Sequence, residues 1–239
     1  MRQWLGLLVA LSLAPACRLS TRLPIFTASG NLRVTVDAWA RLSNASGAVT
    51  ATSKGADDVP EQMRRVNRDG LPSGAPVDLV YVVDTTGSMG DDINAAKAQM
   101  RATLADLTRQ HPDRKVGIVA YRDRGDAYVA RVVLALDVDE RRIQAGIDSL
   151  RTGGGGDLRE HVYAGLDMAL HEQPWRPAAS HHIVLIGDAP PHEDYADDPR
   201  TYASVMAEAA RPELAVKIHT IGVTCDADCQ KALAAEGER

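Results

Sequence analysis

The chain has 239 residues, of which 45% are hydrophobic, and its formal net charge is −5. This length and composition can fill one core of moderate size, so one domain with additions is expected. Aromatic residues are scarce, with a single Phe, so Val, Leu, Ile, Ala and Met must supply the buried surface, as in parallel sheets covered by helices. The acidic balance and the lack of any Lys and Arg cluster that could follow a row of phosphates argue against nucleic acid as a partner.

The N-terminus predicts a secretion signal at residues 1–16. A short basic start precedes an apolar run, Trp4 to Ala14, that is too short to cross a bilayer as a stable helix. The run ends in Leu-Ala-Pro-Ala before Cys17, which resembles the bacterial lipobox, in which the cysteine becomes lipidated. Cleavage after Ala16 without lipidation is the alternative. Both interpretations predict an exported protein of the cell envelope, anchored to a membrane through Cys17 or else periplasmic or secreted.

The two remaining cysteines are expected to form a disulfide. If Cys17 carries a lipid, Cys225 and Cys229 are left as an even pair in an oxidising compartment. A bridge between them closes a very small loop, which a single turn can satisfy. The alternative is a pair of thiols that hold a soft metal, but two more ligands of the right kind are not visible.

Residues 17–76 are expected to form a tether with little regular structure. A strand is suggested at 31–39, and residues 51–76 contain too few large apolar side chains to fold alone. The main domain is therefore expected to occupy residues 77–239.

That domain is predicted to have a doubly wound α/β fold, with a mostly parallel sheet flanked by helices on both faces. Apolar residues recur every three or four positions from Met89 to Leu107, which predicts one apolar helix face. Strands at 115–121 and 128–136 are joined by a short turn at 123–126, which predicts a hairpin and one antiparallel edge strand. Further strands are expected at 77–84, 181–188 and 216–223, and further helices at 139–150, 157–173 and 228–236.

Oxygen-bearing side chains follow the first strand of this domain at alternate positions. Asp84, Thr86 and Ser88 can turn their oxygens toward one point if the chain leaves the strand in extended form. Carboxylate and hydroxyl oxygens suit a hard cation such as Mg²⁺ or Mn²⁺. Asp157 follows four glycines and Asp188 ends another buried strand. These acids should meet Asp84 at one edge, because ligands of open α/β sheets bind beyond the carboxyl ends of the strands.

From about Val77 the chain resembles a von Willebrand factor type A (vWA) domain. The family's metal-ion-dependent adhesion site is written Asp-x-Ser-x-Ser, and residues 84–88 read Asp-Thr-Thr-Gly-Ser, with Thr86 in place of the first Ser. Asp157 stands where the family usually carries a Thr, and the strand that ends at Asp188 is similar to the third part of the signature. The resemblance implies one divalent cation, Mg²⁺ with Mn²⁺ or Ca²⁺ as alternatives, held by Asp84, Thr86, Ser88, Asp157 and Asp188.

Several side chains near this site allow other interpretations. Asp157 with Glu160 three residues later fits the cap and capping box of a helix, which would explain both acids without a metal, and Glu160 is also the alternative metal ligand. His192, on the loop after the last of these acids, is expected to be solvated, although its titration near neutral pH could tune partner binding. His181 and His182 open a strand, where an edge or surface position is expected rather than zinc ligation.

The resemblance implies binding and no enzymatic turnover. In such sites the carboxylate of a partner, a protein or other macromolecule, completes the shell of the cation. Three carboxylates around one divalent ion would reduce its attraction for that acid, so a structural or modest adhesive role is expected. The alternative is a metal-dependent hydrolase in which Asp84, Asp157, Asp188 and His192 activate water. The sequence shows no activated nucleophile and no His-Glu-x-x-His spacing to support it. In a third interpretation the cation serves folding stability alone.

Overall fold

The computed structural model describes residues 28–52, 59–90, 92–157, 159–193 and 195–223. The predicted signal, Cys17, the predicted disulfide and the predicted helix at 228–236 lie outside these residues. In the part of the chain that the structure describes, none of the helices has the length and apolar character needed to cross a bilayer.

A six-stranded sheet with the order β1-β6-β5-β2-β3-β4 forms the centre of the structure. β3 and β4 pair antiparallel at one edge, and all the other neighbours pair parallel, which confirms the predicted doubly wound α/β fold with one antiparallel edge strand. The strands are β1 (Thr50–Thr52), β2 (Val77–Asp84), β3 (Arg114–Tyr121), β4 (Ala130–Asp137), β5 (Ser180–Gly187) and β6 (Lys217–Gly222).

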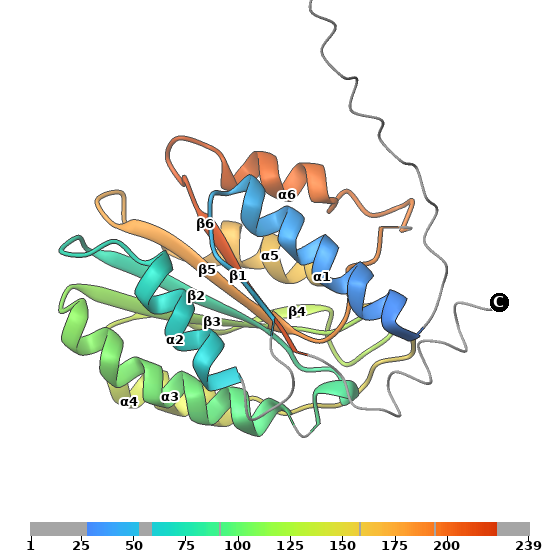
Figure 1. The fold of residues 1–239 in the computed structure, drawn as a ribbon, viewed down its shortest axis with the longest axis horizontal. Coiled ribbons are helices and arrows are strands. Elements are labelled where there is room, and N and C mark those ends of the chain that lie inside the picture. Colours follow the sequence, from blue (N-terminus) through green and yellow to red (C-terminus); the bar gives the residue numbers. More distant parts are fainter. Residues whose placement is uncertain (1–27, 53–58, 91, 158, 194, 224–239) are drawn as a thin grey trace, which may run out of the picture.

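Helices cover both faces of the sheet and bury two separate apolar cores (Figure 1). On one face lie α2 (Val59–Gly70), α3 (Asp92–Gln110) and α4 (Glu140–Ser149). On the other lie α1 (Ala28–Ala45), α5 (Val162–Glu172) and α6 (Tyr202–Ala209).

β2 is the central strand, and every one of its residues is buried. Its side chains alternate between the two cores: Leu79 and Tyr81 face the α3 side, whereas Val80 and Val82 face the α5 side. This burial on both faces explains why residues 79–83 are an uninterrupted apolar run. The two acids of the strand lie near its ends, and Asp78 is paired with Arg176.

Residues 17–76 are predicted to form a tether with little regular structure, and this is wrong for the residues of the segment that the structure describes, 28–52 and 59–76. The segment contributes α1 to one face, α2 to the other, and β1, which pairs parallel with β6 and so extends the sheet. The strand predicted at 31–39 is also wrong, because these residues belong to α1.

The reason is that few apolar side chains are enough when a sheet already exists to receive them. Trp39 and Leu42 of α1 are buried one turn apart, and Val59, Met63 and Val66 of α2 follow a helical spacing onto the α3 side. Sparse apolar content argues against folding alone, but a helix that docks on an existing core needs only one narrow stripe.

The helix predicted at 157–173 begins at Val162, so its predicted start at residue 157 is wrong. The residue before it, His161, makes no side-chain cap, and Glu160 instead forms a parallel bridge with Pro191. The N–H of Glu160 donates to the Pro190 carbonyl at 3.1 Å, and its carbonyl accepts from the N–H of His192 at 3.1 Å. The capping-box interpretation of Glu160 is therefore wrong, and the residue lies in extended chain beside β5.

The prediction of a surface position for His181 and His182 is wrong as well, because both are buried. His182 belongs to a chain of hydrogen bonds inside the structure. The Val49 N–H donates to His219 Nδ1 at 3.1 Å, His219 Nε2 lies 3.0 Å from His182 Nδ1, and His182 Nε2 lies 2.7 Å from Ser180 Oγ. Because the first acceptor is fixed, this order assigns both rings as neutral tautomers that carry the proton on Nε2.

We expect this pair to make the fold sensitive to acid. Burial lowers the pKa of His182 to about 3 and that of His219 to about 4, from the ordinary 6.5. Below the ordinary value the unfolded chain binds protons that the folded chain does not. The free energy of unfolding should therefore fall as the pH drops from about 7.5 to about 5, by up to about 2 kcal/mol for each ring.

Chemical denaturation at the two pH values measures this effect. A His182→Gln variant should lose less stability on acidification than the wild type. His171, which is half exposed on α5, gives the control, because His171→Gln should keep the wild-type pH dependence. Equal losses in the wild type and in His182→Gln would contradict the assignment.

Candidate metal centre

Asp84 closes β2, and its carboxylate fixes the turn that follows. The side chain is fully buried, and its Oδ1 accepts from the Thr86 N–H at 2.9 Å and from the Thr86 hydroxyl at 2.7 Å. The turn then enters a short 3-10 helix, Gly87–Met89, that leaves Ser88 exposed.

Asp188 reaches the same place from the neighbouring strand. β2 and β5 are paired in parallel up to Val83 and Ile186, so the residues that follow them meet at one edge of the sheet. The Ser88 hydroxyl donates to Asp188 Oδ1 at 3.1 Å and lies 3.1 Å from the Thr86 hydroxyl. Of the five predicted site residues, the structure thus joins Asp84, Thr86, Ser88 and Asp188 in one hydrogen-bonded group.

Glu160 lies against this group. Its side chain is 2% exposed, and a Cβ placed on Gly155 would be 3.5 Å from both Glu160 Oε1 and the Thr86 Cβ. The bridge to Pro191 holds the backbone of Glu160 beside the loop that carries Asp188. From the sequence, Glu160 is only the alternative ligand, because its spacing from Asp157 also fits a capping box.

Three carboxylate oxygens in this centre are buried without a hydrogen-bond partner: Asp84 Oδ2, Glu160 Oε2 and Asp188 Oδ2. Among the described residues, none of the three side chains forms an ion pair with a Lys, Arg or His. Buried carboxylates are normally paired, because a lone charge in a protein interior costs several kcal/mol. The three acids therefore have no paired positive charge among the described residues.

The raised pKa values of the three acids reflect the same lack of a paired positive charge. Burial raises the pKa of Asp84 to about 6 and, with the charge of Asp84 nearby, that of Asp188 to about 7. Burial, followed by the charges of Asp84, Asp123 and Asp188, raises the pKa of Glu160 to about 10. Protons or a cation must neutralise such a group.

The donor set fits a hard divalent cation. Three carboxylates and two hydroxyls offer only oxygen, which Mg²⁺ and Mn²⁺ prefer, and the exposed Ser88 leaves one side open to solvent. Asp84, Thr86, Ser88, Glu160 and Asp188 would hold the ion.

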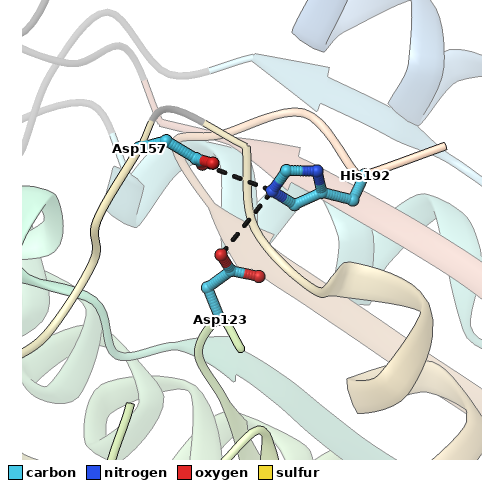
Figure 2. Close-up of side chains that lie close together, drawn as sticks. All are labelled: Asp123, Asp157 and His192. Atoms are coloured by element: carbon cyan, nitrogen blue, oxygen red, sulfur yellow. Dashed lines mark hydrogen bonds and ion pairs between the residues drawn. The ribbon is translucent and has the colours of Figure 1, made fainter. Parts of the chain in front are cut away.

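Asp157 lies outside the hydrogen-bonded group. Its side chain is 46% exposed, and its Oδ1 accepts from the Arg159 N–H at 3.0 Å and lies 3.3 Å from His192 Nε2. Asp123, which the sequence analysis did not single out, lies on the other side of the same ring nitrogen (Figure 2). The expectation that His192 is solvated is wrong, because it is only 7% exposed.

The glycine-rich loop explains how these segments approach one another. Gly153 N–H donates to the Thr85 carbonyl, the Gly87 N–H donates to the Gly154 carbonyl, and the Gly155 N–H donates to the Asp126 carboxylate. Gly154 has a φ of +79°, and a Cβ there would lie 2.0 Å from Asp126 Oδ1. The glycine-rich loop therefore approaches the turn after β2 and the β3–β4 hairpin closely.

A family model for the von Willebrand factor A domain matches residues 78–230, which is more than half of the chain. The chain belongs to this family. The match begins at β2, so the vWA domain includes residues 84–88, and the two N-terminal helices precede it.

Two curated relatives match the vWA part of the chain over about half of its length. The alpha-protein kinase vwkA of Dictyostelium discoideum is 30% identical over 118 residues, which are 48% of this chain and 19% of that protein. The human von Willebrand factor A domain-containing protein 7 is 34% identical over 119 residues, which are 49% of this chain and 12% of that protein. The chain thus corresponds to less than a fifth of each relative.

Solved structures of low sequence identity also match. The VWA domain of SpRpn10 has a TM-score of 0.42 and 11% identity, and the match covers 68% of this chain and 95% of that domain. The pilus adhesin SpaC from Lactobacillus rhamnosus GG has a TM-score of 0.40 and 18% identity, and the match covers 48% of this chain and 16% of that protein.

The structure predicts that Glu160 contributes more than Asp157 to Mg²⁺ affinity. Glu160→Gln removes a buried acid beside Asp84 and should weaken Mg²⁺ binding by at least about tenfold. Asp157→Asn removes a half-exposed charge and should change it by less than about threefold, because exposed charges are screened. Calorimetric titration with Mg²⁺ measures both, and a larger loss in Asp157→Asn would restore the ligand set suggested by the motif.

The loop geometry gives a second prediction. Gly154→Ala should destabilise the domain by at least about 1 kcal/mol, because alanine is strained at positive φ and its Cβ would collide with Asp126. Gly156→Ala is the control, since no atom lies within 4 Å of a Cβ there. Thermal unfolding of both variants should separate them, and similar melting temperatures would contradict the described loop.

Proposed function

We propose that this vWA domain is a non-enzymatic binding module that holds a divalent cation and presents it to a carboxylate of a protein or other macromolecule. The observation that supports this is the set of three buried, unpartnered carboxylate oxygens next to the exposed Ser88. A cation bound there offsets the buried charge and can take a further ligand from the solvent side.

The charge of the centre sets the expected strength of binding. Asp84, Glu160 and Asp188 together can supply more negative charge than one divalent cation carries. Such a centre retains its metal firmly but attracts an acidic partner weakly, because the net charge at the metal is no longer positive. The proposed adhesion is therefore modest, and the cation also stabilises the fold.

We favour binding over hydrolysis because of the partners of the two hydroxyls. Thr86 and Ser88 are hydrogen-bonded to the carboxylates and to each other, and no described hydrogen bond gives either of them a histidine. A hydroxyl nucleophile needs a base in contact with it. His192 instead lies between Asp123 and Asp157.

We also propose that the protein is exported and anchored through a lipid on Cys17. The apolar N-terminal run and the small residues before Cys17 support this. Expression of the wild type and of Cys17→Ala in a bacterium that processes lipoproteins tests it. The wild type should fractionate with membranes and Cys17→Ala should not, whereas identical fractionation would contradict the anchor.

Calorimetry with Mg²⁺ tests the cation site. Asp84→Ala should abolish measurable Mg²⁺ binding, because Asp84 organises the turn and faces the other two acids. Asp106→Ala, which removes an exposed acid of α3, should bind Mg²⁺ as the wild type does. Unchanged binding by Asp84→Ala would overturn the assignment of the centre.

A separate experiment distinguishes adhesion from a purely structural cation. The probe is a short peptide with one Glu, compared with the same peptide carrying Gln, on immobilised protein in Mn²⁺ or in EDTA. We expect the Glu peptide to be retained in Mn²⁺ and not in EDTA. If Mn²⁺ raises the melting temperature but neither peptide is retained, the cation is structural and the proposed adhesive role fails.

A further inference from the structure

We propose a second cation site, separate from the first, built by Asp123, Asp157 and His192 and suited to Zn²⁺ or a similar transition metal. It shares no residue with the group of Asp84 and Asp188. The inference is independent of the proposed adhesive function.

The distances from His192 Nε2 to the two carboxylates are close to those between neighbouring ligands of a small tetrahedral ion. His192 Nε2 lies 3.3 Å from Asp157 Oδ1 and 3.6 Å from Asp123 Oδ2, and one ligand atom from each residue lies within 4.8 Å of the other two. Bonds of about 2.0 to 2.1 Å place neighbouring ligands of a tetrahedral zinc ion roughly 3.3 Å apart. Figure 2 shows one ring nitrogen that faces both carboxylates.

Two other histidines show what a simple ion pair looks like in the same protein. His161 Nε2 lies 2.7 Å from Asp198, the length of a direct hydrogen bond. His171 has two acids, but Asp167 lies against Nδ1 and Glu208 against Nε2. At His192 two carboxylates lie near one nitrogen, at 3.3 and 3.6 Å, which is longer than the contact between His161 and Asp198.

Two of the three ligands are shielded from water, and the ion pairs of the two acids involve His192 and no other basic side chain among the described residues. The side chains of His192 and Asp123 are 5% and 7% exposed. Among the ion pairs of the described residues, His192 is the partner of Asp123 and of Asp157, and no Lys or Arg joins them. Two carboxylates therefore share one imidazole as their ion-pair partner.

Tyr195 fixes the geometry from the side. Its hydroxyl donates to both oxygens of Asp123, at 2.8 and 3.0 Å. Its ring stacks on the imidazole of His192, with centroids 4.1 Å apart, and the Arg124 guanidinium covers the ring. A partner that orients a ligating carboxylate is a usual feature of metal sites.

The chemistry of the ligands distinguishes this site from the first. An imidazole with two carboxylates suits Zn²⁺, Co²⁺ or Ni²⁺, whereas the first centre has only oxygen and suits Mg²⁺. Asp157 is 46% exposed, so a fourth position stays open to water or to a group of another molecule. Three segments supply the ligands: the β3–β4 hairpin, the end of the glycine-rich loop, and the loop after β5.

Titration of the full chain with Co²⁺ in excess Mg²⁺ tests the proposal, because four-coordinate Co²⁺ absorbs strongly in the visible range. One Co²⁺ should bind, and Zn²⁺ should displace it. His192→Asn and Asp157→Asn should each weaken Co²⁺ binding by at least about tenfold. Asp157 is exposed, so its variant should fold even if His192→Asn does not.

Two controls separate this site from the rest of the molecule. His171→Asn removes an exposed histidine that also faces two acids, and it should bind Co²⁺ as the wild type does. Asp84→Ala should lose Mg²⁺ but keep Co²⁺. The proposal is overturned if no visible band develops, if Asp157→Asn leaves it unchanged, or if Asp84→Ala abolishes it.

Discussion

The parallel pairing of β2 with β5 is the interaction on which the candidate metal centre depends. It brings Asp84 and Asp188, far apart in sequence, to one edge of the sheet and buries both carboxylates among apolar strands. Glu160 lies beside them because it forms a bridge with Pro191 in the loop that follows β5. The apolar strands that stabilise the sheet thus also deprive these acids of water, and the fold holds a charge imbalance that a bound cation relieves.

The parts of this arrangement that follow from local pattern could be predicted from sequence. β2 and β5 are long apolar runs that stop on an acid, and their burial on both faces explains that pattern. Asp84, Thr86 and Ser88 are close in sequence, so their geometry depends on one turn. The antiparallel edge followed from a short connection between two strands, which permits only a hairpin.

The remaining parts depend on contacts between distant segments. The spacing of Asp157 and Glu160 fits a capping box at the start of a helix. Only the bridge between Glu160 and Pro191 shows that the chain there is extended. No local sequence pattern marks Asp123 or His192 as a metal ligand. The two residues lie on different loops and meet only in the folded chain. The low apolar content of the segment before Val77 predicts little regular structure. Its helices nevertheless pack on sheet surfaces that later residues form.

That N-terminal segment also sets the limits of a stable fragment. β1 covers the hydrogen-bonding edge of β6, and Trp39 and Leu42 cover apolar side chains on one face of the sheet. A shortened protein that started at β2 would uncover both. An open strand edge beside exposed apolar surface is a template for association with other chains, so such a fragment should aggregate. The short first strand therefore keeps the sheet from growing between molecules.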